Sequence, residues 1–155
     1  PVPHYEHTVV GYNYRLSNLL SGLGRAQLRR LDGMLARRRG LRERYAKLFA
    51  AIPGVRLLDD GPGGNCWLTT IVVDPEVAGW RAADLGAHLG RHAIESRRVF
   101  KPMHLQPVYA HCRASVTGAG ERLFDQGLSL PSGSALDEVQ IGRVLGAVES
   151  FLERR

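Results

Sequence analysis

Two polar side chains near the start of the chain have the chemistry to hold a phosphate group. Asn13 and Arg15 lie in residues 11–17 beside Tyr12 and Tyr14, directly before a long stretch with helical periodicity. The amide and the guanidinium donate hydrogen bonds, and the free N–H groups and dipole of a helix N-terminus also favour an anion. The alternative is that Asn13 is a turn residue and that Arg15 forms a surface ion pair.

A second group of cationic and hydrogen-bonding side chains lies in residues 95–109. It contains Arg97, Lys101, His104 and Gln106. The prolines in this run argue against a helix, so we expect an extended loop. Together, the two segments predict a binding site for something anionic.

Other kinds of site have little support in the sequence. His88 and His92 are four residues apart, as on one helical face, but the glutamate of the zinc-protease motif does not lie between them. His4 and His7 have no third ligand at a recognisable spacing. The chain also has no nucleophile elbow, no phosphate-binding Gly-Lys-Ser loop and no dinucleotide fingerprint. We therefore expect no metal site and no nucleophile-driven enzyme.

The positive charge of the chain comes almost wholly from arginine. The net charge is +6, and only two of the 21 basic residues are lysines, Lys47 and Lys101. Arginine offers a planar fork that suits phosphates of a nucleic acid or of a nucleotide-linked substrate. One cluster is instead expected to be a solvated helix face, because Glu43 interrupts it. This cluster consists of Arg37, Arg38, Arg39, Arg42 and Arg44.

Length and composition fit one ordinary soluble domain. The chain has 155 residues, 44% of them hydrophobic, with no long apolar run and no charged-then-apolar leader. We expect a cytoplasmic protein without a membrane segment. Cys66 and Cys112 do not resemble a disulfide framework or a metal knuckle, so both are expected to be reduced.

Hydrophobic periodicity predicts the helices and strands that position these side chains. Apolar residues recur at helical spacing over residues 17–53, in one helix or in two nearly collinear helices with a bend near Asp32, next to Gly33. Ser17 is a good N-cap, and Asp137 caps a final amphipathic helix. Further helices are expected over residues 81–92 and 119–126, and strands or extended segments over residues 55–58, 66–73, 94–100 and 128–130. This order predicts an α/β (α+β) fold with a small, mostly antiparallel or mixed sheet covered by helices on one face.

The two polar segments and a third motif resemble those of a known family. Residues 11–17, Gly-Tyr-Asn-Tyr-Arg-Leu-Ser, and the stretch over 23–32 resemble the central part of DegT/StrS-type sugar aminotransferases, which are pyridoxal-phosphate enzymes of fold type I. Residues 95–109 and 127–133 resemble late motifs, especially in the branch that aminates 4-keto sugars bound to UDP. The resemblance spans nearly the whole chain.

The resemblance implies that a second part of the enzyme is needed. In this family an N-terminal α/β domain contributes the lysine that binds the cofactor covalently, and neither Lys47 nor Lys101 has a matching context. The chain therefore resembles the C-terminal portion of an enzyme that is inactive without the N-terminal domain. The complete enzyme is expected to be a dimer that uses glutamate to aminate a nucleotide-linked 4-keto-6-deoxy sugar.

The resemblance also implies roles for individual residues. Asn13 matches the asparagine that reaches across the dimer interface to the cofactor phosphate, and Arg15 resembles the arginine beside it. The resemblance also divides the chain into three regions. These are an active-site or interface segment over 1–16, a long connecting helix over 17–53 and a small C-terminal domain over 54–155.

For the substrate, the resemblance implies that Arg97 and Lys101 face the diphosphate. His104 and Gln106 match a loop near the sugar nucleotide, and no catalytic residue is expected in this chain.

Two departures and two alternatives remain. Arg98 stands where the family pattern has proline, and Phe100 where tryptophan is usual, which leaves the sugar open. A non-catalytic interaction module left from a split enzyme would bury its apolar helix face in a partner. A basic nucleic-acid-binding domain would show strongly salt-dependent affinity, but the sequence lacks interleaved aromatic residues and a known binding motif.

Overall fold

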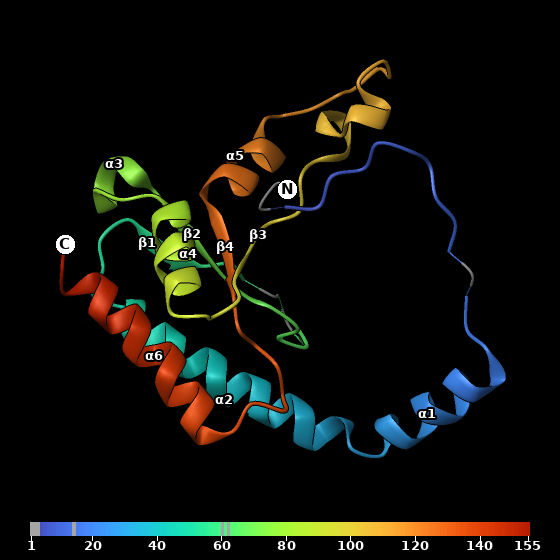
Figure 1. The fold of residues 1–155 in the computed structure, drawn as a ribbon, viewed down its shortest axis with the longest axis horizontal. Coiled ribbons are helices and arrows are strands. Elements are labelled where there is room, and N and C mark those ends of the chain that lie inside the picture. Colours follow the sequence, from blue (N-terminus) through green and yellow to red (C-terminus); the bar gives the residue numbers. More distant parts are fainter. Residues whose placement is uncertain (1–3, 14, 60, 62) are drawn as a thin grey trace.

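A computed structural model describes residues 4–13, 15–59, 61 and 63–155, in which six α-helices, two 3₁₀ turns and four strands follow one another (Figure 1). In chain order the elements are α1 (Asn18–Leu28), α2 (Leu31–Phe49), β1 (Val55–Leu57), β2 (Thr69–Val73), α3 (Pro75–Ala78), α4 (Ala82–Arg91), β3 (Arg97–Arg98), η1 (Met103–Leu105), η2 (Pro107–Tyr109), α5 (Ala119–Gln126), β4 (Gly127–Leu130) and α6 (Glu138–Leu152).

The four strands form one antiparallel sheet in the order β1-β2-β4-β3. The mixed alternative is therefore wrong and the antiparallel one is confirmed. Ile71 of β2 pairs with Leu128 of β4, and the neighbouring pair is Thr70 with Ser129. Because successive side chains of a strand point to opposite faces, these two pairs lie on opposite sides of the sheet.

Helices α2, α4 and α6 cover the face that carries Ile71 and Leu128. Figure 1 shows α2 and α6 side by side on this face, and both contribute to one apolar core. The core residues from these helices and the two central strands include Leu41, Tyr45, Phe49, Ile71, Val73, Leu85, Leu89, Leu128, Leu130, Val144, Val148 and Phe151. The predicted cover of helices on one face is confirmed.

The predicted long helix is two helices, and the break comes earlier than expected. Arg29 and Arg30 form the turn between α1 and α2, whereas Gly33 lies inside α2. Helix α1 has no buried residue, so no packing holds it in line with α2, and Figure 1 shows it extending away from the sheet. Local hydrogen bonding and the lack of packing, rather than glycine, therefore place the bend.

The end of α2 also differs from the prediction. The helix stops at Phe49 rather than near Pro53, and a turn leads to Gly54. Gly54 has a φ of +75°, and a Cβ built there would lie 2.8 Å from the backbone nitrogen of Ala78. Only glycine fits this close approach, which brings β1 beside α3.

Strand β2 begins three residues later than predicted. Asn65 Oδ1 accepts a hydrogen bond from the Trp67 backbone nitrogen, and Cys66 between them has a φ of +47°. A residue with positive φ does not fit strand geometry, so the strand cannot include Cys66. The hydrogen-bonded ladder begins after this turn, at Thr69. Trp67 is consequently an exposed side chain beside the sheet rather than a residue within it.

The remaining elements are close to their predictions. Residues 94–100 pair with the sheet only at β3, while α4, α5 and β4 agree with the predictions within one residue. Ser17 accepts a hydrogen bond from Leu20, and Asp137 forms a capping box with Gln140, so both predicted caps are confirmed. Among the described residues, no helix is both long enough and apolar enough to cross a membrane.

Candidate functional site

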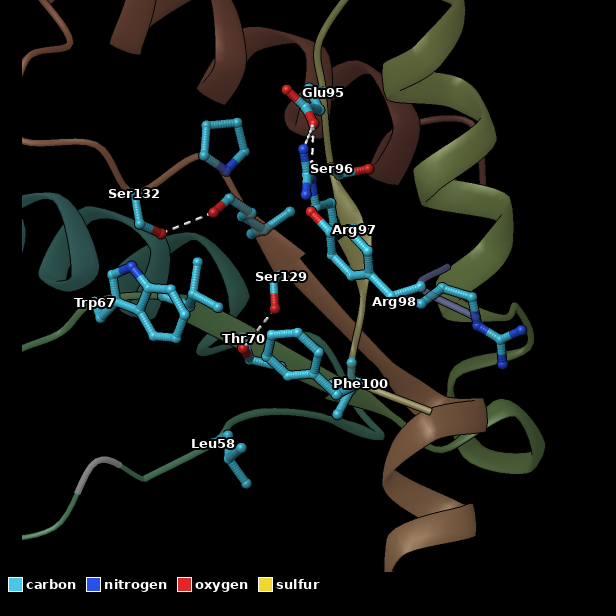
Figure 2. Close-up of a pocket in the computed structure, with 15 residues that line it drawn as sticks. Leu58, Trp67, Thr70, Glu95, Ser96, Arg97, Arg98, Phe100, Ser129 and Ser132 are labelled. Carbon is cyan, nitrogen blue, oxygen red and sulfur yellow. Dashed lines mark hydrogen bonds and ion pairs between the residues drawn. The ribbon is translucent and has the colours of Figure 1, made fainter. Parts of the chain in front are cut away.

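A cavity of about 520 Å³ opens on the second face of the sheet, the face that carries Thr70 and Ser129 (Figure 2). Its lining comes from segments far apart in the sequence. The lining residues are Tyr5, Leu58, Trp67, Leu68, Thr70, Glu95, Ser96, Arg97, Arg98, Val99, Phe100, Ser129, Leu130, Pro131 and Ser132. Of the predicted site residues, only Arg97 is among them.

Hydroxyl groups lie along the strands that border this cavity. The Thr70 and Ser129 hydroxyl oxygens are 2.9 Å apart in a buried hydrogen bond between β2 and β4. Ser132 donates to the carbonyl of Leu130 and accepts from the backbone nitrogen of Thr69. Because one hydrogen of the Thr70–Ser129 pair is used within the pair, the other hydroxyl hydrogen remains to be donated.

Three aromatic side chains make the cavity unusual for a protein surface. Tyr5, Trp67 and Phe100 are 51%, 56% and 57% exposed. The rings of Tyr5 and Phe100 stack with centroids 6.1 Å apart, and the Arg97 guanidinium lies 5.1 Å from the centre of the Tyr5 ring. Large exposed apolar surfaces of this kind mark binding sites more often than isolated exposed residues do.

Two cations border the aromatic group, and each has a carboxylate partner. Arg97 donates to Glu95 at 2.7 Å, and Lys101 donates to Glu6 at 2.8 Å. The hydrogen bond from Lys101 lowers the pKa of the Glu6 carboxyl below its usual value. The Arg97 and Glu95 side chains are 54% and 72% exposed, and an ion pair this exposed contributes little stability, so an anionic ligand could replace Glu95 at low cost.

Gln106 joins the segment over residues 4–10 to the loop over residues 97–108. Its side chain is only 2% exposed; Oε1 accepts from the His7 backbone nitrogen at 2.9 Å, and Nε2 donates to the carbonyls of Tyr5 and Lys101. Val108 adds a backbone hydrogen bond to His7. Both amide hydrogens of Gln106 are thus committed to backbone groups, which fits a positioning role better than ligand contact.

His104 is likewise tied to a neighbouring element. Its Nε2 lies 2.7 Å from Glu121 Oε1 on α5, and both side chains are partly buried. The pKa of the Glu121 carboxyl is lowered by a hydrogen bond from the backbone nitrogen of Glu121 and, to a smaller extent, by the hydrogen bond from His104. Because this carboxylate is ionised at neutral pH, His104 is the donor and its ring orientation is fixed.

Asn13 and Arg15 lie outside the cavity, in the exposed segment before α1. Asn13 Oδ1 accepts from the Arg15 backbone nitrogen at 2.9 Å, and Arg15 has a φ of +66°, which is uncommon for a residue with a side chain. Within the described part of the chain, Asn13 Nδ2 and the Arg15 guanidinium have no partner. Both donor groups are thus available to an anion, while Tyr14 lies outside the described residues.

The histidine pair that the sequence analysis considered as a metal site lies at one end of α4. The His88 and His92 rings are 4.6 Å apart, and among the described residues no three His, Cys, Asp or Glu side chains are grouped to hold a metal ion.

The arginine cluster is partly structural rather than merely solvated. Arg37 donates to the carbonyl of Leu136, Arg42 donates to that of Leu58, and Arg44 pairs with Glu138. These contacts connect α2 to the rest of the domain.

Sequence reasoning did not identify the aromatic walls of the cavity. The sequence pattern places Trp67 within a strand, the family resemblance marks Phe100 only as a departure, and no motif singles out Tyr5. No local signal in the sequence marks these three aromatic residues as one group. Their convergence depends on chain segments 33 and 62 residues apart, which no local pattern specifies.

Comparison with known proteins gives a consistent family match. A model of the DegT/DnrJ/EryC1/StrS aminotransferase family matches residues 2–149. The putative pyridoxal phosphate-dependent aminotransferase EpsN of Bacillus subtilis is 37% identical over 151 residues, which cover 94% of this chain and 38% of EpsN. The GDP-perosamine synthase of Vibrio cholerae is 32% identical over 149 residues, covering 95% of this chain and 40% of the synthase.

Solved structures show the same relationship. DesV of S. venezuelae superimposes with a TM-score of 0.74 and 31% identity, covering 97% of this chain and 40% of DesV. Helicobacter pylori PseC, an aminotransferase involved in the biosynthesis of pseudoaminic acid, has a TM-score of 0.76 at 19% identity and shows the shared fold. The chain thus spans about two fifths of the length of the relatives it matches.

Proposed function

Because the chain belongs to the DegT/DnrJ/EryC1/StrS aminotransferase family, we propose that it forms the C-terminal part of a pyridoxal-phosphate-dependent sugar transaminase. The proposed reaction aminates a nucleotide-linked 4-keto-6-deoxy sugar with glutamate as the amino donor. Two of the relatives support a nucleotide-linked substrate, because they are named GDP-perosamine synthase and dTDP-3-amino-3,4,6-trideoxy-alpha-D-glucose transaminase. UDP, expected from the sequence motifs, remains one candidate among the nucleotides.

The observation that carries this proposal is the direct connection between the two segments that the sequence singled out. Gln106 and the Lys101–Glu6 ion pair attach residues 4–10 to the loop that carries Arg97 and His104. Residues 11–15 continue directly from the attached segment. The donors proposed for the cofactor thus directly follow, in the chain, the segment that is attached to the substrate loop.

The donor groups of the first segment fit a cofactor phosphate. Asn13 Nδ2 and the Arg15 guanidinium are exposed and available, and they would hold the phosphate of pyridoxal phosphate in a neighbouring subunit. When bound, this cofactor supplies the electron sink that transamination requires. Asn13 and Arg15 would bind and orient it, and neither side chain would transfer a proton.

The second segment would hold the substrate. Arg97 would exchange Glu95 for the diphosphate, and Lys101 would donate to it while remaining bound to Glu6, since charge-assisted hydrogen bonds to phosphate suit both cations. His104, whose Nε2–H donates to Glu121, would accept a hydrogen bond from a sugar hydroxyl through Nδ1. Gln106 would position this loop through its buried amide.

The lysine for covalent attachment of the cofactor would come from another part of the enzyme. Lys47 lies on α2, and Lys101 is bound to Glu6. We propose that an N-terminal domain supplies this lysine, that the active enzyme is a dimer, and that these 155 residues by themselves have no transaminase activity.

A chimeric enzyme tests this proposal. Residues 1–155 would replace the matching region of the Vibrio cholerae GDP-perosamine synthase, and the glutamate half-reaction would be followed by cofactor absorbance. We expect activity in the chimera and a weaker affinity for pyridoxal phosphate in its Asn13→Ala variant. A folded chimera that binds the cofactor but does not react with glutamate would contradict the proposal.

One observation favours the non-catalytic alternative. Leu19, Leu20 and Leu23 of α1 share one side of the helix and are 88%, 50% and 55% exposed, so this side is apolar and uncovered. An interaction module would use this side whether or not the chain contributes to catalysis. Sedimentation of the chimera and of its inactive variants separates the two functions, because association alone would persist without glutamate turnover.

A further inference from the structure

We propose that Arg98 is a positioning residue, which holds α5 against the loop over residues 97–108 and thereby fixes His104. The family resemblance gives this side chain no role, because the family pattern has proline at its position. The inference rests on the proposed function for the task of His104 at the sugar, whereas the attachment of α5 is a property of this chain by itself.

Arg98 makes three contacts with the last turn of α5. Its guanidinium carbon lies 4.1 Å from the centre of the Phe124 ring, and its Nη2 donates to the Phe124 carbonyl at 2.9 Å and lies 3.5 Å from Asp125 Oδ1. The side chain is only 23% exposed, and Figure 2 shows it directed away from the cavity. A planar guanidinium can stack on a ring and donate within its own plane at the same time, which an ammonium group cannot do.

These contacts supply what α5 lacks at its C-terminal end. The last carbonyls of a helix have no partner within the helix, and a positive charge beside them is favourable. Helix α5 has no basic residue in its last turn, so Arg98 provides the cation from β3. The Phe124 carbonyl, near the end of the helix, receives the hydrogen bond. Arg98 therefore acts as a C-terminal cap that comes from another element.

The residues that follow Arg98 pack closely against both ends of α5. A Cβ built on Gly127, directly after the helix, would clash with the Val99 side chain, and one built on Gly120 would lie 3.4 Å from Pro102 Cγ. Helix α5 has no buried residue of its own, so its position depends on contacts such as these.

The first half of α5 carries the partner of His104. Glu121 lies three residues before Phe124, so the two side chains share one side of the helix. Glu121 Oε1 accepts the hydrogen bond from His104 Nε2 at 2.7 Å. A helix that is released at Phe124 would carry the Glu121 carboxylate with it, and the His104 ring would lose its fixed orientation.

The neighbouring arginine shows that this arrangement is specific to Arg98. The Arg97 side chain is 54% exposed, and its partner Glu95 is only two residues away in the chain. The Phe124 carbonyl that Arg98 binds is 26 residues away. Arg97 can thus exchange its partner for a ligand, whereas Arg98 joins two elements of the fold.

NMR spectroscopy of the 155-residue chain tests this inference. A histidine ring N–H that is bound to a carboxylate exchanges slowly with water and gives a separate proton resonance, and the His104 resonance is identified by its loss in His104→Gln. We expect this resonance in the wild-type chain and its loss in Arg98→Met, which keeps much of the side-chain bulk without the charge or the donors. Phe124→Leu should weaken it as well, because it removes the ring on which the guanidinium packs.

Two further variants are controls for charge. Arg122→Met removes an exposed cation from the same helix, whose charge acts on Glu121, and it should leave the resonance unchanged. Arg98→Lys should retain part of the resonance, because an ammonium group can still donate to the Phe124 carbonyl. Thermal unfolding of each variant confirms that the fold is intact.

Two results would overturn the inference. One is a His104 resonance that is as strong in Arg98→Met as in Arg122→Met, because α5 would then hold His104 without Arg98. The other is loss of the whole fold in both Arg98→Met and Phe124→Leu, which would show that Arg98 stabilises the domain rather than positions one loop.

The chimera separates this inference from the proposed function. In an active chimera, Arg98→Met should raise the KM for the sugar nucleotide by roughly threefold to tenfold, as expected for the loss of one hydrogen bond, and should change kcat less. A lost resonance in a chimera that is inert to glutamate would refute the transaminase proposal alone. An unchanged resonance together with normal glutamate turnover would refute the role of Arg98 alone.

Discussion

The two faces of the four-stranded sheet differ in what their side chains do. On one face, Ile71 and Leu128 are at most 2% exposed beneath α2, α4 and α6. On the other face, Thr70 and Ser129 share a hydrogen bond beside a cavity whose aromatic rings are more than half exposed. Neighbours in one strand thus face the packed core and the cavity in turn, because strand side chains alternate between faces.

This difference predicts that substitutions on the two faces have unequal effects on stability. Substitutions on the cavity face remove little buried apolar surface, whereas those on the helical face leave a hole in close packing. The following predictions test this separation of the two faces, in order of decreasing effect.

The same substitution on the two faces should have very different costs. Phe49→Ala, in the core at 2% exposure, should lower the free energy of unfolding by about 3–5 kcal/mol. Phe100→Ala, at 57% exposure, should change it by no more than about 0.5 kcal/mol. Urea unfolding measures both, and Phe49→Leu provides a milder core variant if Phe49→Ala does not fold. Equal losses at the two positions would show that the cavity face also carries the fold.

Gln106 should be the exception on the cavity side. Gln106→Leu leaves the His7 nitrogen and two carbonyls without their partner, so we expect a loss of about 1–3 kcal/mol. Faster hydrogen exchange at the His7 amide should accompany it. Gln27→Leu, at an exposed position of α1, is the control and should have a much smaller effect. Unchanged exchange at His7 would show that residues 4–10 are attached without Gln106.

Tyr45 connects the packed face to the border of the cavity. Its hydroxyl donates to the Pro131 carbonyl at 2.8 Å, and burial strongly raises its pKa, so the phenol stays protonated. Tyr45→Phe should cost about 1 kcal/mol of stability, because it removes one buried hydrogen bond. If the faces are independent, the affinity of the chimera for its sugar nucleotide should not change. Weaker binding in this variant would instead reveal coupling through Pro131.

The smallest effect should be a pH dependence on the packed side. Burial, and then the charge of His92, lower the pKa of His88 below its usual value of 6.5. The unfolded chain therefore binds the proton more readily, and stability should fall as the pH decreases below about 6.5. Unfolding measured from pH 8 to pH 5 should show a steeper loss in wild type than in His88→Gln. His111→Gln, at an exposed position, should follow wild type.

Much of the fold could be predicted because its signals are local. Ser17 and Asp137 lie next to the helices that they cap, and the apolar spacing of α6 lies within fifteen residues. The break between α1 and α2 was misplaced because glycine is only a weak local signal, whereas the missing packing of α1 is a property of the whole molecule. The start of β2 was misplaced because the turn at Cys66 overrides the β-favouring composition.

The candidate site was predicted less completely. Arg97, Lys101 and His104 stood out by residue type, but their partners Glu95, Glu6 and Glu121 give each a different environment. Gln106 was assigned to substrate contact from its motif, and its burial could not be seen in the sequence.

The sequence by itself determined the family, the helix caps and the alternation that gives the strands two unlike faces. Only the tertiary structure decided that Tyr5, Trp67 and Phe100 meet around one cavity and that Gln106 is buried against residues about 100 positions away. The physical reason is the range of the interactions. Caps and periodicity act over a few residues, whereas a cavity and a buried amide exist only when distant segments are packed together.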